Sequence, residues 1–256
     1  MTIELPPLHE DMVFLSPISE QRAAGFVDWL AGGLTAGTTM LDVGCGWAEL
    51  SLRVAVAAPR AHVVGVDLDE QSLEVARRRA RERHLDDRTQ FLPGDGAITG
   101  PDEVDALVAI GASQVWGQES EKMPPLPYAA ALSGIRDRVR VGARVLYGDG
   151  VWSRSPTPEA TAPLAGRDDE FVTLPELVDL AVEHGFAPVA VQEASQDEWD
   201  AFESGFTARY ATWLATHEPD HPDAAEVRDR ARRQRDAYFR GYRGILGLAY
   251  LQLLAV

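Results

Sequence analysis

The sequence has 256 residues, 45% of them apolar, and this suits one elaborated globular domain rather than a disordered or fibrous chain. The 24 basic and 40 acidic residues leave a formal net charge of −16. A chain that acidic repels a phosphate backbone unless its few cations gather on one face. We therefore expect neither nucleic acid nor an anionic membrane as a partner.

The cysteine content and the apolar stretches bear on the compartment. The single cysteine, Cys45, can form neither an intrachain disulfide nor a thiolate metal cluster. The first ten residues carry acids where a signal peptide carries bases. The longest strongly apolar stretch, residues 245–256, is shorter than the ~20 residues of a membrane span. We expect a cytoplasmic protein.

Short β-rich runs alternate with segments of helical spacing along most of the chain. The predicted strands are residues 40–43, 63–67, 90–92, 106–110, 144–147, 189–192 and 245–254. The predicted helices between the early strands are residues 48–58, 69–83 and 127–139. This alternation predicts an α/β fold, with a parallel sheet covered by helices on both faces.

Two capping boxes mark the starts of later helices. Thr173 pairs with Glu176 and Ser195 with Glu198, so we interpret Glu198 as a helix cap before a catalytic base. The second of these helices carries aromatic residues at intervals of three and four: Trp199, Phe202, Phe206, Tyr210 and Trp213.

A further helix, about residues 224–240, follows that aromatic helix before the last strand. The last two strands are thus separated by far more than the ~2 to 5 residues of a hairpin loop. We predict that residues 195–243 form a helical insertion within a single domain of residues 1–256. The aromatic face is expected to close over a substrate. Burial against the sheet or a second subunit is the alternative, and residues 14–19 would then close the pocket.

The sharpest chemical signal is the turn after the first predicted strand. Gly44, Cys45 and Gly46 lead into a helix, and glycines there let backbone N–H groups approach an anionic ligand group. Asp67 ends the second strand, where a carboxylate can accept from both ribose hydroxyls. Asp95 follows the third strand between glycines, where it can meet an adenine edge. The set predicts a ligand that contains a nucleoside.

The spacing D-x-G-x-G-x-A, which runs from Asp42 to Ala48, resembles motif I of the class I S-adenosylmethionine-dependent methyltransferases. The dinucleotide fingerprint G-x-G-x-x-G fails, because Glu49 stands where it needs Gly or Ala. The resemblance implies seven strands with the last one antiparallel, and S-adenosyl-L-methionine as the cofactor. It also implies cofactor contacts from Asp42, Gly44, Cys45, Gly46, Asp67, Leu68, Gly94, Asp95, Gly96, Ile110 and Gly111.

The resemblance covers residues 19–192 and the last strand, with two departures from the family pattern. Ala48 stands at the third motif glycine, a change small enough to leave binding intact. Residues 110–117 lack the Asn/Asp-Pro-Pro-aromatic signature of many amino-directed DNA and protein enzymes, so that acceptor class is not supported.

The implied reaction is in-line transfer of a methyl group to an N, O, S or C atom of a small molecule. Four residues are candidates for the acceptor side, each with packing as the alternative: Gln114, Trp116, Trp152 and Trp199. No general base stands out, and the six histidines show no metal-ligand spacing. The alternatives are an inactive cofactor-binding sensor or assembly protein, and an aminopropyl-type transferase. We expect a monomer or a homodimer.

Overall fold

The computed structural model describes residues 3–117 and 125–256. Its centre is a seven-stranded sheet in the order β3-β2-β1-β4-β5-β7-β6, in which only the pairs that β7 makes are antiparallel. The strands are β1 (Thr39–Val43), β2 (His62–Asp67), β3 (Thr89–Pro93), β4 (Val104–Ile110), β5 (Val139–Trp152), β6 (Phe186–Glu193) and β7 (Leu246–Ala255). The predicted fold class is confirmed.

One strand departs clearly from its predicted bounds. β5 extends for 14 residues, far beyond the expected residues 144–147, and pairs with β7 along its whole second half. Trp152, predicted to follow this strand, is instead its last residue and lies opposite Leu246. The glycines at 148 and 150, which suggested a strand end, let other groups approach the strand closely, because a Cβ at Gly148 would lie 2.7 Å from the Ala249 carbonyl oxygen.

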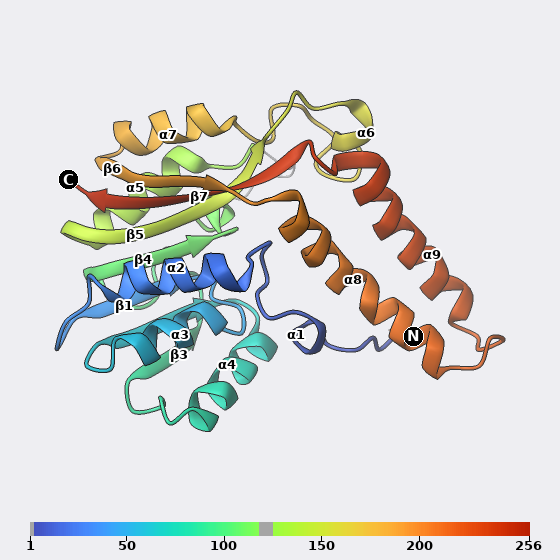
Figure 1. The fold of residues 1–256 in the computed structure, drawn as a ribbon, viewed down its shortest axis with the longest axis horizontal. Helices are drawn as coiled ribbons and strands as arrows, with labels where there is room; N and C mark the ends of the chain where they lie inside the picture. The colour runs from blue at the N-terminus through green and yellow to red at the C-terminus, as the bar shows by residue number, and fades with distance from the viewer. Residues whose placement is uncertain (1–2, 118–124) are drawn as a thin grey trace.

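Helices cover both faces of the sheet, and the strands divide their side chains between two cores (Figure 1). Met40 packs toward α2 (Glu20–Ala31), α3 (Glu49–Ala57) and α4 (Glu70–Glu82). Its neighbour Leu41 packs toward α5 (Tyr128–Arg138) and α7 (Leu174–Glu183). This alternation follows from the two-residue period of a strand, and burial on both faces explains why the strands read as continuous apolar runs.

The predicted insertion between β6 and β7 is an antiparallel helical pair that projects from the sheet (Figure 1). It consists of α8 (Gln196–Thr216), α9 (Ala224–Asp236) and a π-helical turn, η2 (Ala237–Tyr242). Both capping boxes, at Thr173 and at Ser195, are present as predicted. The short helices α1 (Leu8–Asp11), η1 (Ser113–Trp116) and α6 (Pro158–Thr161) complete the described elements.

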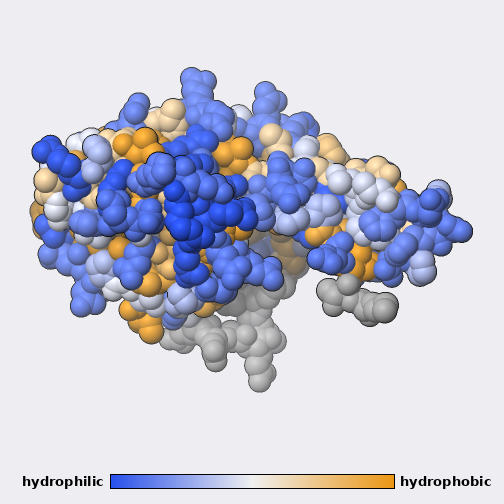
Figure 2. Space-filling view, turned by 90° about the horizontal axis from the view of Figure 1, so that it is seen from below, coloured by the Kyte–Doolittle hydropathy of each residue, from blue (hydrophilic) through white to orange (hydrophobic). Residues whose placement is uncertain are grey.

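Figure 2 views the molecule from the side of α4, with the α8–α9 pair as an arm on the right. Hydrophilic residues cover much of this face. The arginines of α4 that contribute to it form ion pairs, among them Arg77 with Glu70 and Arg78 with Glu82, as expected for a solvated helix face. In the ranges that the structure describes, every helix is too short or too polar to cross a bilayer.

Candidate functional site

The site begins in the turn between β1 and α3. Gly44 and Gly46 have φ of +72° and +52°, the left-handed region that glycine adopts without strain. Ala48 shares this conformation, with φ of +56°, and is the residue before the first turn of α3. The conformation explains why this position favours glycine or, failing that, a residue as small as alanine. The turn keeps backbone N–H groups at a helix N-terminus, where they can meet an anionic group.

Asp67, at the end of β2, ties this glycine turn to the neighbouring strand. Its carboxylate accepts hydrogen bonds from the backbone N–H of Gly46 at 2.7 Å and of Asp69 at 2.9 Å. The N–H groups of Gly44 and Cys45 both donate to the Val66 carbonyl oxygen, at 2.8 and 3.1 Å. The position of the turn therefore depends on β2, and Asp67 both shapes the turn and faces the space beside it.

That space is a cavity of about 620 Å³ at the carboxyl ends of β1, β2, β3 and β4. All of the predicted cofactor-contact residues line it, and so does Gln114. A further part of the lining was not among the predicted cofactor contacts: Phe14, Leu15, Ser16, Ile18, Trp47, Ala48, Glu49, Leu50, Val66, Val108, Ala112 and Val115. A ligand at this edge of the sheet matches the usual location in open α/β folds.

Two titratable groups in the cavity wall are uncharged at low or moderate pH. Burial raises the pKa of Asp42 to about 7, although a hydrogen bond from the Ser51 hydroxyl acts in the opposite direction. Burial, together with the negative charges of Asp42 and Asp67, raises the pKa of the Cys45 thiol far above its usual range. Cys45 is therefore a small wall residue rather than a nucleophile.

Glu49, the first residue of α3, is a buried carboxylate in the cavity wall. It forms ion pairs with Arg53 of α3 at 2.9 Å, with Arg79 of α4 at 3.4 Å, and with Arg83 at the end of α4 at 2.8 Å. The sequence prediction used Glu49 only to reject a dinucleotide fingerprint. Its arginine partners lie 4, 30 and 34 residues away, and only the first follows a helical spacing that sequence inspection can detect.

Buried hydrogen bonds to β5 fix the position of the loop after β4. The Ser113 N–H donates to Asp149 at 2.9 Å, and the Gly111 N–H donates to the Gly148 carbonyl at 2.7 Å. The Ser113 and Tyr147 hydroxyls are 2.5 Å apart. Burial raises the pKa of the Asp149 carboxyl group. These contacts fix the backbone of residues 111–113, so Gly111 and Gln114 reach the cavity from a rigid support.

An N-terminal strap, residues 12–18, forms the remaining wall of the cavity. The Trp47 indole N–H donates to the Val13 carbonyl at 2.7 Å. The Tyr250 hydroxyl donates to the Pro17 carbonyl at 3.0 Å and lies 3.1 Å from the Ser16 hydroxyl. Residues 14–18 of the N-terminal segment, which were expected to close the pocket if the aromatic face of α8 did not, therefore form one wall of this cavity.

The aromatic face of α8 packs within the chain. Trp199 is buried in the main core, with its ring against Phe202 and Tyr242, and lines neither this cavity nor the one described next. Phe206 packs in a cluster that contains Met12 and Trp47. The expectation that Trp199 contacts an acceptor is therefore not supported by its position, because neighbouring side chains cover it.

Trp116 and Trp152 also lie outside the cavity lining. Trp116 packs on α5, where a Cβ on Gly134 would lie 2.4 Å from its indole nitrogen. Trp152 is buried against Phe171, and its indole N–H donates to the Asp168 carbonyl at 2.7 Å. Neither side chain lines this cavity, because the backbone of a strand or loop sets where a residue begins but its side chain can still turn toward the core. An acceptor role for Trp116 and Trp152 stays a prediction.

Replacing Trp152 with phenylalanine is expected to lower the free energy of unfolding by about 1–2 kcal/mol, because the indole volume and one hydrogen bond are lost. Affinity for the expected cofactor, S-adenosyl-L-methionine, should stay the same, because the side chain does not line the cavity. Urea denaturation and calorimetric titration measure the two quantities. A tenfold loss of affinity in a folded variant would contradict this placement.

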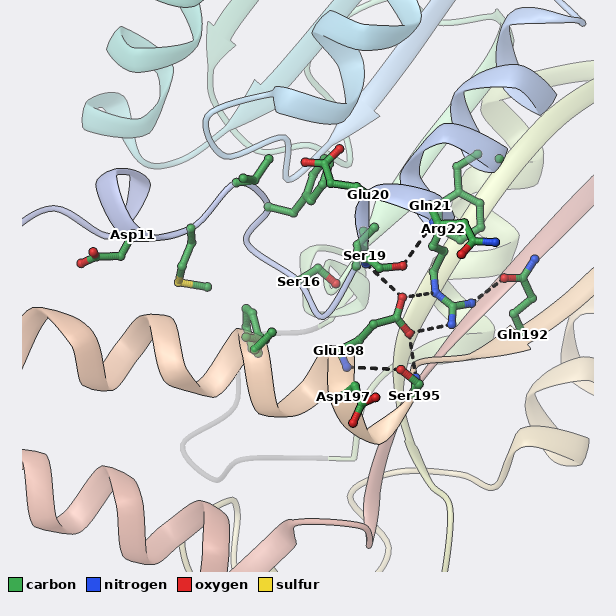
Figure 3. A pocket seen from close by; sticks show the side chains of 18 residues that line it. Asp11, Ser16, Ser19, Glu20, Gln21, Arg22, Gln192, Ser195, Asp197 and Glu198 are labelled. Carbon is green, nitrogen blue, oxygen red and sulfur yellow. Dashed lines mark hydrogen bonds and ion pairs between the residues drawn. The ribbon is translucent and has the colours of Figure 1, made fainter.

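A second cavity, of about 780 Å³, lies between the strap, the start of α2 and α8 (Figure 3). Phe14, Ser16 and Ile18 line both cavities, so the strap is their common wall. Arg22 and Glu198 face each other across the second cavity's edge and form an ion pair at 2.7 Å. Glu198 does cap α8, as predicted, but its contact with Arg22 joins residues 176 positions apart and has no local sequence signal.

Comparisons with known proteins agree with this geometry. A family model described as "Methyltransferase domain" matches residues 34–105, which include β1, β2 and β3. A crystal structure of an S-adenosylmethionine-dependent methyltransferase from Geobacter sulfurreducens, in complex with S-adenosyl-L-homocysteine, superposes with a TM-score of 0.81. It is 25% identical and the alignment covers 97% of this chain and 96% of that one. The fold is that of the class I enzymes, and these similarities support an S-adenosylmethionine-dependent methyltransferase.

Two curated relatives add detail. This methyltransferase is 28% identical over 219 residues to the uncharacterized protein YjhP of Escherichia coli strain K12, covering 83% of this chain and 82% of the relative. It is 29% identical over 187 residues to the 27-O-demethylrifamycin SV methyltransferase of Amycolatopsis mediterranei, covering 69% and 65%. In the described ranges of this methyltransferase, no three His, Cys, Asp or Glu side chains are grouped in a way that could hold a metal ion.

Proposed function

We propose that the protein transfers a methyl group from S-adenosylmethionine, held in the 620 Å³ cavity, to a nucleophilic atom of a small-molecule acceptor. The observation that carries the proposal is the common location of all the predicted cofactor-contact residues in one cavity wall. A relative named for the acceptor 27-O-demethylrifamycin SV supports a small-molecule acceptor.

The cavity fits the cofactor in shape and in chemistry. Gly44 and Ala112 both line the cavity, and a Cβ on Gly44 would lie only 3.1 Å from the Ala112 Cβ. The φ of +72° at Gly44 also excludes an unstrained side chain. The ligand-facing backbone of the turn is therefore left bare, as close approach to a ligand requires. The cavity volume of about 620 Å³ lies within the range of ~300–1,000 Å³ typical of small-molecule sites.

We assign the two acids at the strand ends to the nucleoside. Asp67 would accept from the ribose hydroxyls, and Asp95, between Gly94 and Gly96, would meet the adenine edge. Leu68 follows Asp67 and is exposed, so it can cover one face of the ring. This leaves the side formed by Asp42, the glycine turn and the strap for the amino acid portion, whose carboxylate suits the helix N-terminus.

The bound cofactor supplies an electrophilic methyl group on a sulfonium ion. The task of the chain is to hold an acceptor in line with that group and to keep water away, for which effective molarities can approach ~10⁵ M or more. The buried support under Gly111 and the strap anchored by Trp47 and Tyr250 provide two rigid walls for this purpose. No side chain in the described cavity wall presents a clear general base, so the proposal assigns none.

Replacing Asp67 with alanine is expected to weaken S-adenosylhomocysteine binding by about 1.5–3 kcal/mol, roughly ten- to a hundredfold. The loss has two sources: the hydrogen bonds to the ribose, and the anchor of the Gly46 N–H, which frees the turn. Isothermal titration calorimetry measures the effect. Asp87→Ala, at an exposed position outside the cavity, is the matched control and should bind like the parent protein.

Unchanged affinity in a folded Asp67→Ala protein would overturn the assignment of the cavity. Turnover separates the remaining functional classes. A methyltransferase releases S-adenosylhomocysteine, an aminopropyl-type transferase does not, and a sensor or assembly protein binds the cofactor without consuming it. Incubation with a metabolite panel, followed by mass spectrometry of the cofactor products, distinguishes these three results.

A further inference from the structure

We propose that the 780 Å³ cavity beside the strap is the acceptor site and that it takes an apolar amine. This inference rests on the proposed function, since the amine must meet the methyl donor of the neighbouring cavity. Three features support it: the position of the cavity, the pairing of Arg22, and the nature of the other lining residues (Figure 3).

The two cavities are separated only by the strap. Phe14, Ser16 and Ile18 have surfaces in both, so an acceptor in the second cavity and a cofactor in the first lie against the same three residues. With the nucleoside over Asp67 and Asp95, the remaining lining residues that could hold the amino acid and sulfonium portion would include those of the strap. Ser16 is the small residue of the three, and its hydroxyl is held to one side by Tyr250. The reacting atoms can therefore meet beside Ser16.

Arg22, the one cation among the described lining residues, already uses most of its donors within the protein. Arg22 donates from Nε and Nη2 to Glu198 at 2.7 Å, from Nη1 to Gln192 at 2.5 Å, and from Nη2 to the Glu193 carbonyl at 3.1 Å. Its guanidinium also lies over the Tyr250 ring, 5.3 Å from the centroid. Four hydrogen bonds from five N–H groups leave no bidentate fork for a carboxylate or phosphate.

The other charged lining residues are all acids. Asp11 and Asp197 are exposed on opposite sides of the cavity, one on α1 and one in the first turn of α8 (Figure 3). Glu20 adds a third carboxylate, shared with Arg53. Asp11 and Asp197 therefore leave uncompensated negative charge at the rim of the cavity, which favours a cation over an anion there.

The rest of the wall is apolar. Met12, Phe14, Phe26 and Phe202 are buried or half-buried and present hydrocarbon and ring surfaces to the cavity. An acceptor with an aromatic or aliphatic body and one amino group matches both parts of the wall, because the body contacts the rings while the ammonium group faces the carboxylates. A neutral alcohol of the same shape would gain only the first of these contacts.

The bound ammonium ion first loses one proton to water. The lone pair of the neutral nitrogen then forms the N–C bond, while the pair of the breaking S–C bond stays on sulfur. The positive charge moves from sulfur to nitrogen, and no oxidant or other reactant is needed.

The test compares three probes of one shape: 2-phenylethylamine, 2-phenylethanol and 3-phenylpropionate. Binding of each to the protein loaded with S-adenosylhomocysteine is followed by ligand-observed NMR titration. The amine should bind most tightly, the alcohol more weakly, and the carboxylate not detectably. Supply of S-adenosylmethionine should then yield an N-methylated product from the amine alone.

Two pairs of variants locate the site. Ala201→Phe fills the second cavity from the exposed side of α8 and should weaken amine binding roughly tenfold, while Ala211→Phe, on the same helix outside the cavity, should not. Asp197→Asn should weaken it about two- to fivefold, while Asp220→Asn, exposed and outside the cavity, should not. All four variants should bind S-adenosylhomocysteine like the parent protein.

Three results would overturn the inference: carboxylate or alcohol binding as tight as amine binding, equal effects of the two phenylalanine variants, or no binding of the amine. Titration with S-adenosylhomocysteine alone is performed first. Its failure counts against the proposed function, whereas normal titration followed by any of the three results counts against the acceptor site only.

Discussion

Replacing Glu198 with alanine is expected to lower the free energy of unfolding by about 3–5 kcal/mol. The Glu198 carboxylate accepts from the Arg22 side chain and from the backbone N–H groups of Ser19 and Ser195, which are the N-cap residues of α2 and α8. Truncation leaves the largely buried Arg22 without its counter-ion and both helix starts without a bond. The two helices belong to opposite ends of the chain, so a single side chain stabilises a long-range contact.

The pH dependence of this effect has a definite sign. Burial alone would raise the pKa of Glu198, but the hydrogen bonds from Arg22, Ser195 and Ser19 outweigh it and hold the pKa well below its usual range. A depressed pKa means that the contribution is complete above the ordinary value of 4.5 and is lost as pH falls toward the folded-state value.

Urea denaturation of the parent protein and the Glu198→Ala variant between pH 3 and pH 8 measures this difference. The exposed Glu218 supplies the control, because its truncation should change stability by less than about 0.5 kcal/mol. An equal loss in both variants, or a loss independent of pH below 4.5, would refute the role of the Arg22 pair.

Replacing Asp42 with asparagine is expected to stabilise the ligand-free protein at pH 8 by up to about 4 kcal/mol. Burial raises the pKa of Asp42 from 3.8 to about 7, so folding favours the protonated carboxyl group. The stability associated with this proton is complete below pH 3.8 and is lost as pH rises through about 7. Asparagine keeps an acceptor for the Ser51 hydroxyl but never ionises.

The quantity to measure is the difference in unfolding free energy between the two proteins, because the other titrating groups are common to both. This difference should be small at pH 4 and grow up to pH 7–8. Ser51→Ala serves as a second variant: removal of the donor should raise the pKa of Asp42 further and shift the pH dependence upward. A constant difference across the pH range would show that Asp42 is ionised throughout.

The sheet and the cofactor side were predictable from sequence because their signals are local. A buried parallel strand is a short apolar run, and its carboxyl end must lie at one edge of the sheet, so Asp67 and Asp95 could be placed beside Gly44 without any long-range information. The parallel topology then brings these residues to one site, since parallel strands have their carboxyl ends at the same edge of the sheet.

The acceptor side was not predictable in the same way. Backbone position is set by the strand, but the direction of Trp116 or Trp152 is set by which neighbour offers space, here Gly134 and Phe171. The strap and the pair formed by Arg22 and Glu198 depend on contacts across most of the chain. Such contacts carry no periodicity, and a single sequence holds no trace of them.

On the proposed assignment of the two cavities, the strap would also link the two ligands energetically. Because Phe14, Ser16 and Ile18 are part of both cavities, any shift that a ligand in one cavity imposes on them is felt in the other. The resulting coupling free energy is reciprocal: the factor by which the cofactor changes acceptor affinity equals the factor by which the acceptor changes cofactor affinity. Any relaxation of the strap after S-adenosylhomocysteine forms would then also weaken binding of the methylated acceptor. Release of one product would promote release of the other.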